Sequence, residues 1–270
     1  MSSTQIIGSV QVKNEDIYVA QAILNILDFC DTVIITDNLS TDRTYEICER
    51  LAGQYSKIKL KSIMHPRDAA VLLEPYYGTN TWVFGVDGDE IYDPQRLLIM
   101  RERIISGEFS GFWCVLGNVL NVTSLDIKRK KAYGYLAPPS RSMTKLYNFS
   151  LIEDWKNCPE RLLGDEVFFK KGFHVGLRNS LYKDTSWDQA DFRCLHMPFM
   201  KRSSRQKIRL LRTRLNPDEI NYVNLQPTRF LKFFRRTELL INQFLGRDWK
   251  SQKYRRGPRV VKDVASFFTG

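Results

Sequence analysis

The chain has 270 residues, 43% of them hydrophobic and 26% charged, which is typical of a soluble globular protein with a sizeable core. This length fits one large domain, or one domain with an appendage. No apolar run approaches the ~20 residues of a membrane-spanning helix, and no basic region precedes the first apolar segment, so we expect neither a span nor a signal peptide. The five cysteines are widely spaced and contain no CxxC pair, which argues against zinc and disulfide frameworks and predicts a reducing, cytoplasmic setting.

The net charge of +11 is concentrated near the C-terminus. Between Lys201 and Asp263 there are 18 lysines and arginines against five acids, whereas the rest of the chain carries 23 against 25. We therefore predict a nearly neutral domain at 1–200 and a basic helical extension at 201–270. Such a block indicates an anionic partner: a membrane surface, a nucleic acid or a phosphorylated substrate.

The first 90 residues alternate between two hydrophobic patterns. Helical spacing of apolar residues predicts helices at 17–27 and 43–52. Short apolar runs predict strands at 5–12, 31–36, 58–63 and 82–86. This alternation predicts βαβ units, and hence an α/β fold with a mostly parallel, Rossmann-type sheet flanked by helices.

Polar residues follow three of these strands. They are Asn14 with Glu15, then Asp37, then Asp87 with Asp89. In open parallel sheets, ligands bind beyond the carboxyl ends of the strands. Each cluster alone is ordinary loop chemistry, but together they predict a polar edge large enough for a nucleotide.

The acidic stretch after the fourth strand, Asp87-Gly88-Asp89-Glu90, organises this edge. In extended chain, Asp87 and Asp89 would point to one side, and Gly88 would let the backbone turn or approach a ligand closely. Two such carboxylates suit a hard divalent cation that also holds substrate phosphates. The alternative is a solvated acidic turn that merely ends the strand.

The second half has a weaker pattern. We predict a helix at 94–106, an exposed polar excursion at 126–145 and a strand at 193–197 that contains His196. The apolar run at 109–122 predicts one or two core strands, and 145–149 a further strand. The acidic residues between 153 and 170, around Trp155, include candidates for a general base.

The basic extension divides into predicted helices at 201–215 and 228–245, followed by a flexible segment at 247–270. The second helix has an aromatic, apolar face beside basic residues. The favoured interpretation is that this face packs on the core. The alternative is that it lies on an anionic bilayer.

Three motifs in this order resemble one family. Val12-Lys13-Asn14-Glu15 is similar to its opening strand and Asn-Glu signature, and Asp37 to Thr44 is similar to its D-x-x-S-x-D-x-T element. Trp82 to Glu90 is similar to the W-x-x-x-x-D-x-D-E form of its metal motif. Over roughly the first 100 residues, the chain therefore resembles family 2 glycosyltransferases of the GT-A fold. The resemblance implies a nucleotide-sugar half at about 1–107 and an acceptor half at about 108–200.

The resemblance also implies roles for individual residues. Arg67 would lie near the donor phosphates, and Asp87 would contact the ribose, or the metal through water. Asp89 would be the direct metal ligand, and His196 would complete the metal or diphosphate site, so the implied metal set is Asp87, Asp89 and His196. The implied donor contacts are Val12, Asn14, Glu15, Asp37, Arg67 and Asp87.

The catalytic base has more than one candidate. Trp155 to Leu162 is similar to a family segment that ends in His-Glu-Arg-Leu, with Pro159 in place of the usual histidine. That alignment gives Glu160 the acidic catalytic position. Asp165 and Glu166 are similar to the Glu-Asp pair that supplies the base in other members, so both alternatives stay open.

These features predict a metal-dependent, inverting glycosyltransferase that uses Mn²⁺ or Mg²⁺ and a nucleotide-sugar, with a UDP-sugar ranked ahead of a GDP-sugar. A diphosphate leaving group calls for a cation and one base, whereas a glycosidase needs a second carboxyl group as acid. Acceptors would be a surface polysaccharide, a lipid-linked sugar or a protein, and the enzyme would be cytoplasmic or peripheral at the inner face of a membrane. The alternative is a nucleic-acid- or membrane-binding protein that uses its basic block on a non-catalytic scaffold. The basic block shows no nucleic-acid signature, and no glycine-rich phosphate loop supports nucleotidyl transfer.

Overall fold

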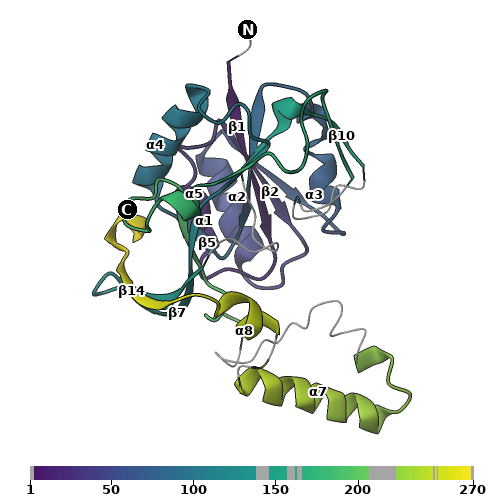
Figure 1. Cartoon of the computed structure of the whole chain (residues 1–270). Coiled ribbons are helices and arrows are strands. Elements are labelled where there is room, and N and C mark those ends of the chain that lie inside the picture. The colour runs from purple at the N-terminus through teal and green to yellow at the C-terminus, as the bar shows by residue number, and fades with distance from the viewer. Residues whose placement is uncertain are drawn as a thin grey trace.

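A computed structural model describes residues 3–137, 146–156, 162, 166–206, 223–245, 247 and 249–268. An α/β body holds the two sheets, and helix α7 lies away from it at the lower end of Figure 1. The α/β fold with a mainly parallel central sheet is thus confirmed.

The central sheet has seven strands. Its parallel half has the order β3-β2-β1-β4, and β9, β6 and β12 extend it beyond β4, with β9 antiparallel to both β4 and β6. The strand bounds are β1 (Gln5–Val12), β2 (Thr32–Asp37), β3 (Ile58–Ser62), β4 (Thr81–Asp87), β6 (Cys114–Leu116), β9 (Leu146–Asn148) and β12 (Arg178–Ser180). The four predicted N-terminal strands are confirmed, and the apolar run at 109–122 forms β6 and the start of a second strand, β7.

Both faces of the sheet are buried along β1, β2 and β4, which explains the mostly apolar sequence of these three strands. Neighbouring residues of one strand belong to different cores: Ile6 packs in one hydrophobic cluster and Ile7 in another. The first cluster includes residues of the predicted helices, α1 (Val19–Leu24), α2 (Thr44–Gln54) and α4 (Pro94–Ile105). The second cluster contains residues of α3 (Asp68–Val71) and of the short helix η1 (Glu74–Tyr76). It also includes a group of aromatic side chains around Trp113 and Trp155.

A second, five-stranded sheet was not predicted from the sequence. Its order is β14-β8-β7-β13-β5. The bounds are β5 (Glu90–Tyr92), β7 (Asn118–Asp126), β8 (Lys131–Ala137), β13 (Arg193–His196) and β14 (Arg259–Asp263). The prediction of an exposed excursion at 126–145 is therefore wrong for residues 131–137, which form β8. Residues 138–145 lie outside the described part of the chain. Gly134 permits the close β7–β8 approach, because a Cβ there would lie 2.2 Å from the carbonyl oxygen of Asn121.

One buried ion pair ties this sheet to the helical layer. Asp93 caps α4 by accepting a hydrogen bond from the Arg96 amide at 3.3 Å. Its other oxygen accepts from Arg193 Nη2 at 2.7 Å and from Ser266 Oγ at 2.6 Å. The Arg193 guanidinium also lies over the ring of Trp187, at 5.6 Å from its centroid. One carboxylate thus joins α4, β13 and the C-terminal segment.

Smaller elements complete the body. They are η2 (Phe149–Leu151), a two-stranded ribbon of β10 (Ile152–Trp155) and β11 (Val167–Phe169), and α5 (Leu181–Asp184).

The C-terminal extension only partly follows the prediction. Helix α7 (Arg229–Phe244) is present as expected, and α8 (Trp249–Tyr254) follows it, whereas most of the expected helix at 201–215 lies outside the described residues. The segment expected to be flexible forms β14 and η3 (Ala265–Phe268), and Phe267 is fully buried against Trp187 with ring centroids 5.9 Å apart. The domain boundary at residue 200 stays a prediction. Among the described helices, none combines the length and the apolar character that crossing a bilayer would require.

Candidate active site

The acidic turn lies where the two sheets meet. β4 of the first sheet ends at Asp87 and β5 of the second begins at Glu90, so Gly88 and Asp89 form the link. A Cβ on Gly88 would lie 2.5 Å from Glu15 Oε2, so this glycine allows the two chain segments to approach. Asp89 is 1% exposed and Glu90 is fully buried. The alternative of a solvated acidic turn is therefore wrong.

His196 lies beside Asp89 because β13 pairs with β5. The antiparallel register sets His196 opposite Glu90, and His196 Nε2 is 3.9 Å from Asp89 Oδ2. On the other side of the ring, Nδ1 is 2.9 Å from Asn121 Oδ1. A carbonyl oxygen only accepts, so Nδ1 donates this hydrogen bond and Nε2 is the ring nitrogen that faces Asp89. The ring of Tyr254 packs edge-on against the imidazole at 4.9 Å.

Polar residues form an edge of the sheet where β1 and β2 end. Val12 is in register with Asp37, and the chain then turns through Asn14, whose φ of 56° is the left-handed conformation that asparagine tolerates. The Asn14 amide donates to Ser40 Oγ at 3.0 Å, and the Ser40 amide donates to Asp37 Oδ2 at 2.9 Å. Asp37 Oδ1 is buried and has no hydrogen-bond partner in the described part of the chain. A buried oxygen of this kind suits a donor group on a ligand.

Arg202 is a site residue that the sequence analysis missed. Its Nη1 donates to Glu15 Oε1 at 2.9 Å and to Asp89 Oδ2 at 3.0 Å. Burial disfavours the charged guanidinium, but the charges of Asp89, Glu15 and Asp87 outweigh this effect and raise the pKa of Arg202 above its usual range. The available signal was an arginine six residues after His196, but it was counted only as part of the basic block.

The segment that carries Arg202 is tied to the loops after β1 and β2. Ser203 Oγ donates to Asp42 Oδ2 at 2.5 Å, and the Ser204 amide donates to Asp16 Oδ1 at 2.6 Å. Asp42 belongs to the motif after β2, and Asp16 follows the Asn-Glu signature. Residues 202–204 therefore lie against the loops after β1 and β2, which was not expected of residues assigned to a separate extension.

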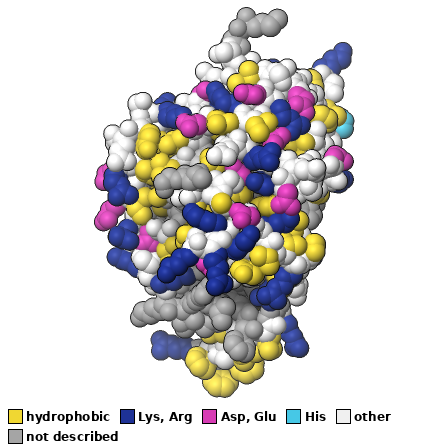
Figure 2. Space-filling view, turned by 90° about the vertical axis from the view of Figure 1, so that its left-hand side faces the viewer, with side chains coloured by type: hydrophobic (Ala, Val, Ile, Leu, Met, Phe, Trp, Pro, Cys, Tyr) yellow, Lys and Arg dark blue, Asp and Glu magenta, His cyan; other side chains and the backbone are white. Residues whose placement is uncertain are grey.

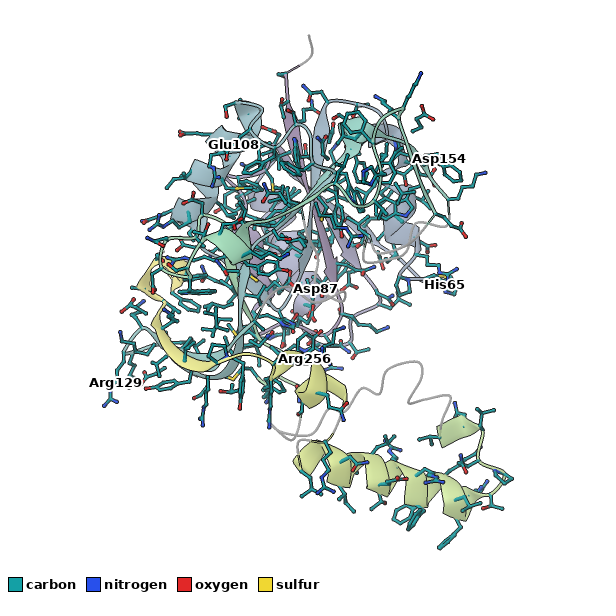
Figure 3. The ribbon with its side chains drawn as sticks, in the orientation of Figure 1. His65, Asp87, Glu108, Arg129, Asp154 and Arg256 are labelled. Carbon is teal, nitrogen blue, oxygen red and sulfur yellow. The ribbon has the colours of Figure 1, made fainter. Side chains whose placement is uncertain are left out.

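The remaining predicted residues are not brought together with this cluster. Arg67 is exposed at the start of α3, and no hydrogen bond or ion pair joins its side chain to another described residue. Glu166 is exposed just before β11. Asp154 on the partner strand β10 is well separated from Asp87 in Figure 3. Glu160 and Asp165 lie outside the described residues, so the base assignment stays a prediction.

The chemistry of Asp89 and His196 fits a divalent cation. Ligand oxygens and nitrogens lie about 2.0–2.2 Å from Mg²⁺ or Zn²⁺-sized ions, so atoms up to about 4.2 Å apart can share one ion. The Asp89 Oδ2 to His196 Nε2 distance of 3.9 Å satisfies this limit. Within the described ranges there is no group of three or more acidic, histidine or cysteine ligands. Water and substrate oxygens would have to supply the other ligands.

Comparison with known protein families identifies the class of protein. The sequence profile described as glycosyl transferase family 2 matches residues 10–185, which is more than half of the chain. The chain belongs to this family, and the expected class of enzyme is confirmed at that level. No curated protein sequence matches the chain.

Several solved structures are similar to parts of the chain. S. aureus TarS 1-349 in complex with UDP is 16% identical with a TM-score of 0.39, over 71% of this chain and 57% of that one. The mannosyltransferase PcManGT from Pyrobaculum calidifontis, with GDP-Man and Mn²⁺, is 16% identical with a TM-score of 0.32, over 46% and 37%. Glucosyl-3-phosphoglycerate synthase from Mycobacterium tuberculosis, with Mn²⁺, UDP and glucosyl-3-phosphoglycerate, is 22% identical with a TM-score of 0.28, over 41% and 43%. The chain thus spans less than two thirds of the length of each.

Proposed function

We propose that this family 2 glycosyltransferase moves a sugar from a nucleotide-sugar donor to a hydroxyl acceptor with the help of Mn²⁺ or Mg²⁺. The observation that carries the proposal is the pair Asp89 Oδ2 and His196 Nε2, 3.9 Å apart, beside the carboxyl end of β4. A UDP-sugar ranks ahead of a GDP-sugar as donor.

The residues at the carboxyl ends of β1, β2 and β4 would bind different parts of the donor. Asp37 offers its buried Oδ1 to a hydrogen-bond donor on the nucleoside, and Asn14 and Glu15 shape the same loop. Asp87 ends β4 in register with Gln11 of β1, and a ribose hydroxyl is the donor group that we assign to it. The cation, when bound, stabilises the negative charge that develops on the departing diphosphate.

Transfer also requires a base for the acceptor hydroxyl. In a single displacement the acceptor oxygen attacks the anomeric carbon as the bond to the diphosphate breaks, and one carboxylate takes the proton. Glu160, Asp165 and Glu166 are the candidates for this base, and a single displacement inverts the anomeric centre. Glu160→Gln should reduce turnover while sparing donor binding. If Asp165→Asn or Glu166→Gln has this effect and Glu160→Gln does not, the base is the other acid.

A thermal-shift screen of UDP-, GDP-, CMP- and dTDP-sugars with Mn²⁺ tests the donor proposal. A ligand at 100 times its Kd stabilises the native state by about 2.7 kcal/mol. For a domain of this size that corresponds to an increase in Tm of roughly 5–10 °C. Asp89→Asn should remove the increase, whereas Asp126→Asn, which changes a half-buried carboxylate at the end of β7, should retain it. Equal shifts in EDTA and in Mn²⁺ would contradict metal-dependent binding.

We also propose that α7 places the enzyme on an anionic membrane, where lipid-linked acceptors lie. The favoured interpretation of the sequence, that its apolar face packs on the core, is wrong for Phe230, Phe233 and Phe234, which are 75%, 71% and 56% exposed. Figure 2 shows apolar side chains flanked by Lys or Arg at the lower end of the molecule, where α7 lies in Figure 1. Lys232 and Arg236 on the helix would meet lipid phosphates.

Liposome sedimentation tests this surface. Phe233→Ser should reduce binding to vesicles that contain an anionic phospholipid, and salt should weaken binding of the wild type. Ile127→Ser removes a side chain that is 56% exposed on the body and serves as the matched control. The membrane proposal would be refuted if the wild type did not bind the vesicles. It would also be refuted if Ile127→Ser reduced binding as much as Phe233→Ser. Binding to DNA or RNA instead would favour the nucleic-acid alternative.

A further inference from the structure

Arg202 and the proposed metal use the same carboxylate oxygen. Asp89 Oδ2 accepts a hydrogen bond from Arg202 Nη1 at 3.0 Å, and it is also the oxygen that faces His196 Nε2 at 3.9 Å. The same Nη1 bridges to Glu15 Oε1 at 2.9 Å. A cation shared by Asp89 and His196 would therefore meet the positive guanidinium at a distance where like charges repel.

We infer that Arg202 is a resident counter-cation that competes with the metal for Asp89 and couples metal binding to diphosphate binding. This inference rests on the proposed function of the site. In the protein without donor, the guanidinium neutralises Asp89 and Glu15 and opposes entry of a divalent ion. When a diphosphate arrives with the ion, its negative charge gives the guanidinium a new partner, and Asp89 is released to the metal.

The surrounding contacts allow the side chain to change partner while the backbone stays. The carbonyl of Arg202 accepts from the Ile17 amide at 3.2 Å, and Ser203 and Ser204 are bonded to Asp42 and Asp16. These contacts hold the backbone of residues 202–204 against the loop after β1 and the loop after β2. The Arg202 side chain is 28% exposed and long enough to swing, so exchange needs only rotamer changes.

Coupling follows from this exchange. Arg202 lowers the affinity for the ion alone, because the ion must displace a hydrogen-bonded charge. It raises the affinity for the ion in the presence of a diphosphate, because the released guanidinium then pairs with that anion. By linkage, the ion and the diphosphate each strengthen the binding of the other by the same factor.

Calorimetric titration of MnCl₂, with and without inorganic pyrophosphate, tests the inference. For Arg202→Gln we expect Mn²⁺ alone to bind about 10 to 100 times more tightly than to wild type. This factor corresponds to the free energy of one hydrogen bond between charged groups. The factor by which pyrophosphate improves Mn²⁺ affinity should fall in the same variant. Arg205→Gln changes an exposed arginine of the same segment and should match wild type.

Arg202→Lys provides a second variant that keeps the charge. Its ammonium keeps the positive charge but is more strongly hydrated and sits on a shorter side chain, so it should neutralise Asp89 less well, and we expect an Mn²⁺ affinity between those of wild type and Arg202→Gln. Unchanged or weaker Mn²⁺ binding in Arg202→Gln overturns the competition. If nucleotide-sugars and Mn²⁺ still bind to both proteins, the proposed function stands without the coupling. If Mn²⁺ binds none of the proteins, with or without pyrophosphate, both proposals fail.

Discussion

Asn121 orients the histidine of the proposed metal pair, and its removal gives a sharp test of the site. Asn121 is 1% exposed on β7, and its Oδ1 is 2.9 Å from His196 Nδ1. In Asn121→Leu the Nδ1–H would lose its acceptor in a buried place. The ring would then gain by moving its proton to Nε2, the nitrogen that the metal requires.

The expected size of the effect follows from this loss of an outer-sphere partner. Such changes typically weaken metal affinity by about 10- to 100-fold, or about 1.4–2.8 kcal/mol. Asn121→Asp keeps an acceptor oxygen at the same position and adds a charge that makes the imidazole a better ligand. We therefore expect Asn121→Asp to bind Mn²⁺ at least as tightly as wild type.

Mn²⁺ titration followed by electron paramagnetic resonance measures the free ion directly, with saturating pyrophosphate present throughout. Long-range ¹H–¹⁵N spectra of the histidines report which ring nitrogen of His196 carries the proton. Far-UV circular dichroism and Tm show whether Asn121→Leu is folded. Wild-type Mn²⁺ affinity in a folded Asn121→Leu, or an unprotonated Nδ1 in the wild type, would refute the assignment of His196 Nε2 as the ligand.

Three further outcomes are expected. Asp93→Asn removes the charged partner of a buried arginine and should lower stability by about 3–5 kcal/mol, or Tm by roughly 6–20 °C, whereas Asp263→Asn at an exposed pair should change Tm little in calorimetry. Burial tends to raise the pKa of Asp42, but hydrogen bonds, first among them that from Ser203, hold it below 3.8. The stability from this interaction is therefore present above the ordinary pKa and lost as pH falls through the lowered one, so the Tm difference between wild type and Ser203→Ala should shrink below about pH 4. Burial, and then the charge of Asp37, raises the pKa of the Cys48 thiol to about 12, so alkylation mapped by mass spectrometry should miss this residue in native protein at pH 8.

The parallel half of the central sheet was predictable because its signals are local. The strands β1, β2 and β4 are short, mostly apolar runs bounded by turn residues, and β3 alternates apolar residues with lysines. The apolar residues of the helices α1 and α2 recur at helical spacing. The end of each strand could therefore be located to within one or two residues. The positions of Asp37 and Asp87 at the same edge of the sheet could then be predicted, because a parallel sheet brings the carboxyl ends of its strands together.

The second sheet was not predictable in the same way. β5 has three residues and begins with a glutamate, and β8 begins with a lysine and contains Gly134, so neither has a strong strand pattern. Each has a partner that is distant in sequence: β5 pairs with β13, and β8 pairs on one side with β14, more than 120 residues further along the chain. The proximity of His196 to Asp89 depends on this sheet, so family resemblance could suggest His196 but the local pattern could not place it. Arg202 was missed for the same reason.

The location of the acidic turn explains why residues near the C-terminus bear on the site. Asp87 ends a strand of one sheet and Glu90 begins a strand of the other, so the position of Asp89 depends on how the two sheets meet. β13 carries His196, and three residues earlier it carries Arg193, whose guanidinium lies over the ring of Phe267 at 5.5 Å. The ring of Tyr254 in α8 packs on the imidazole itself. The C-terminal residues from Tyr254 to Phe268 are therefore part of the structure that holds the proposed metal pair.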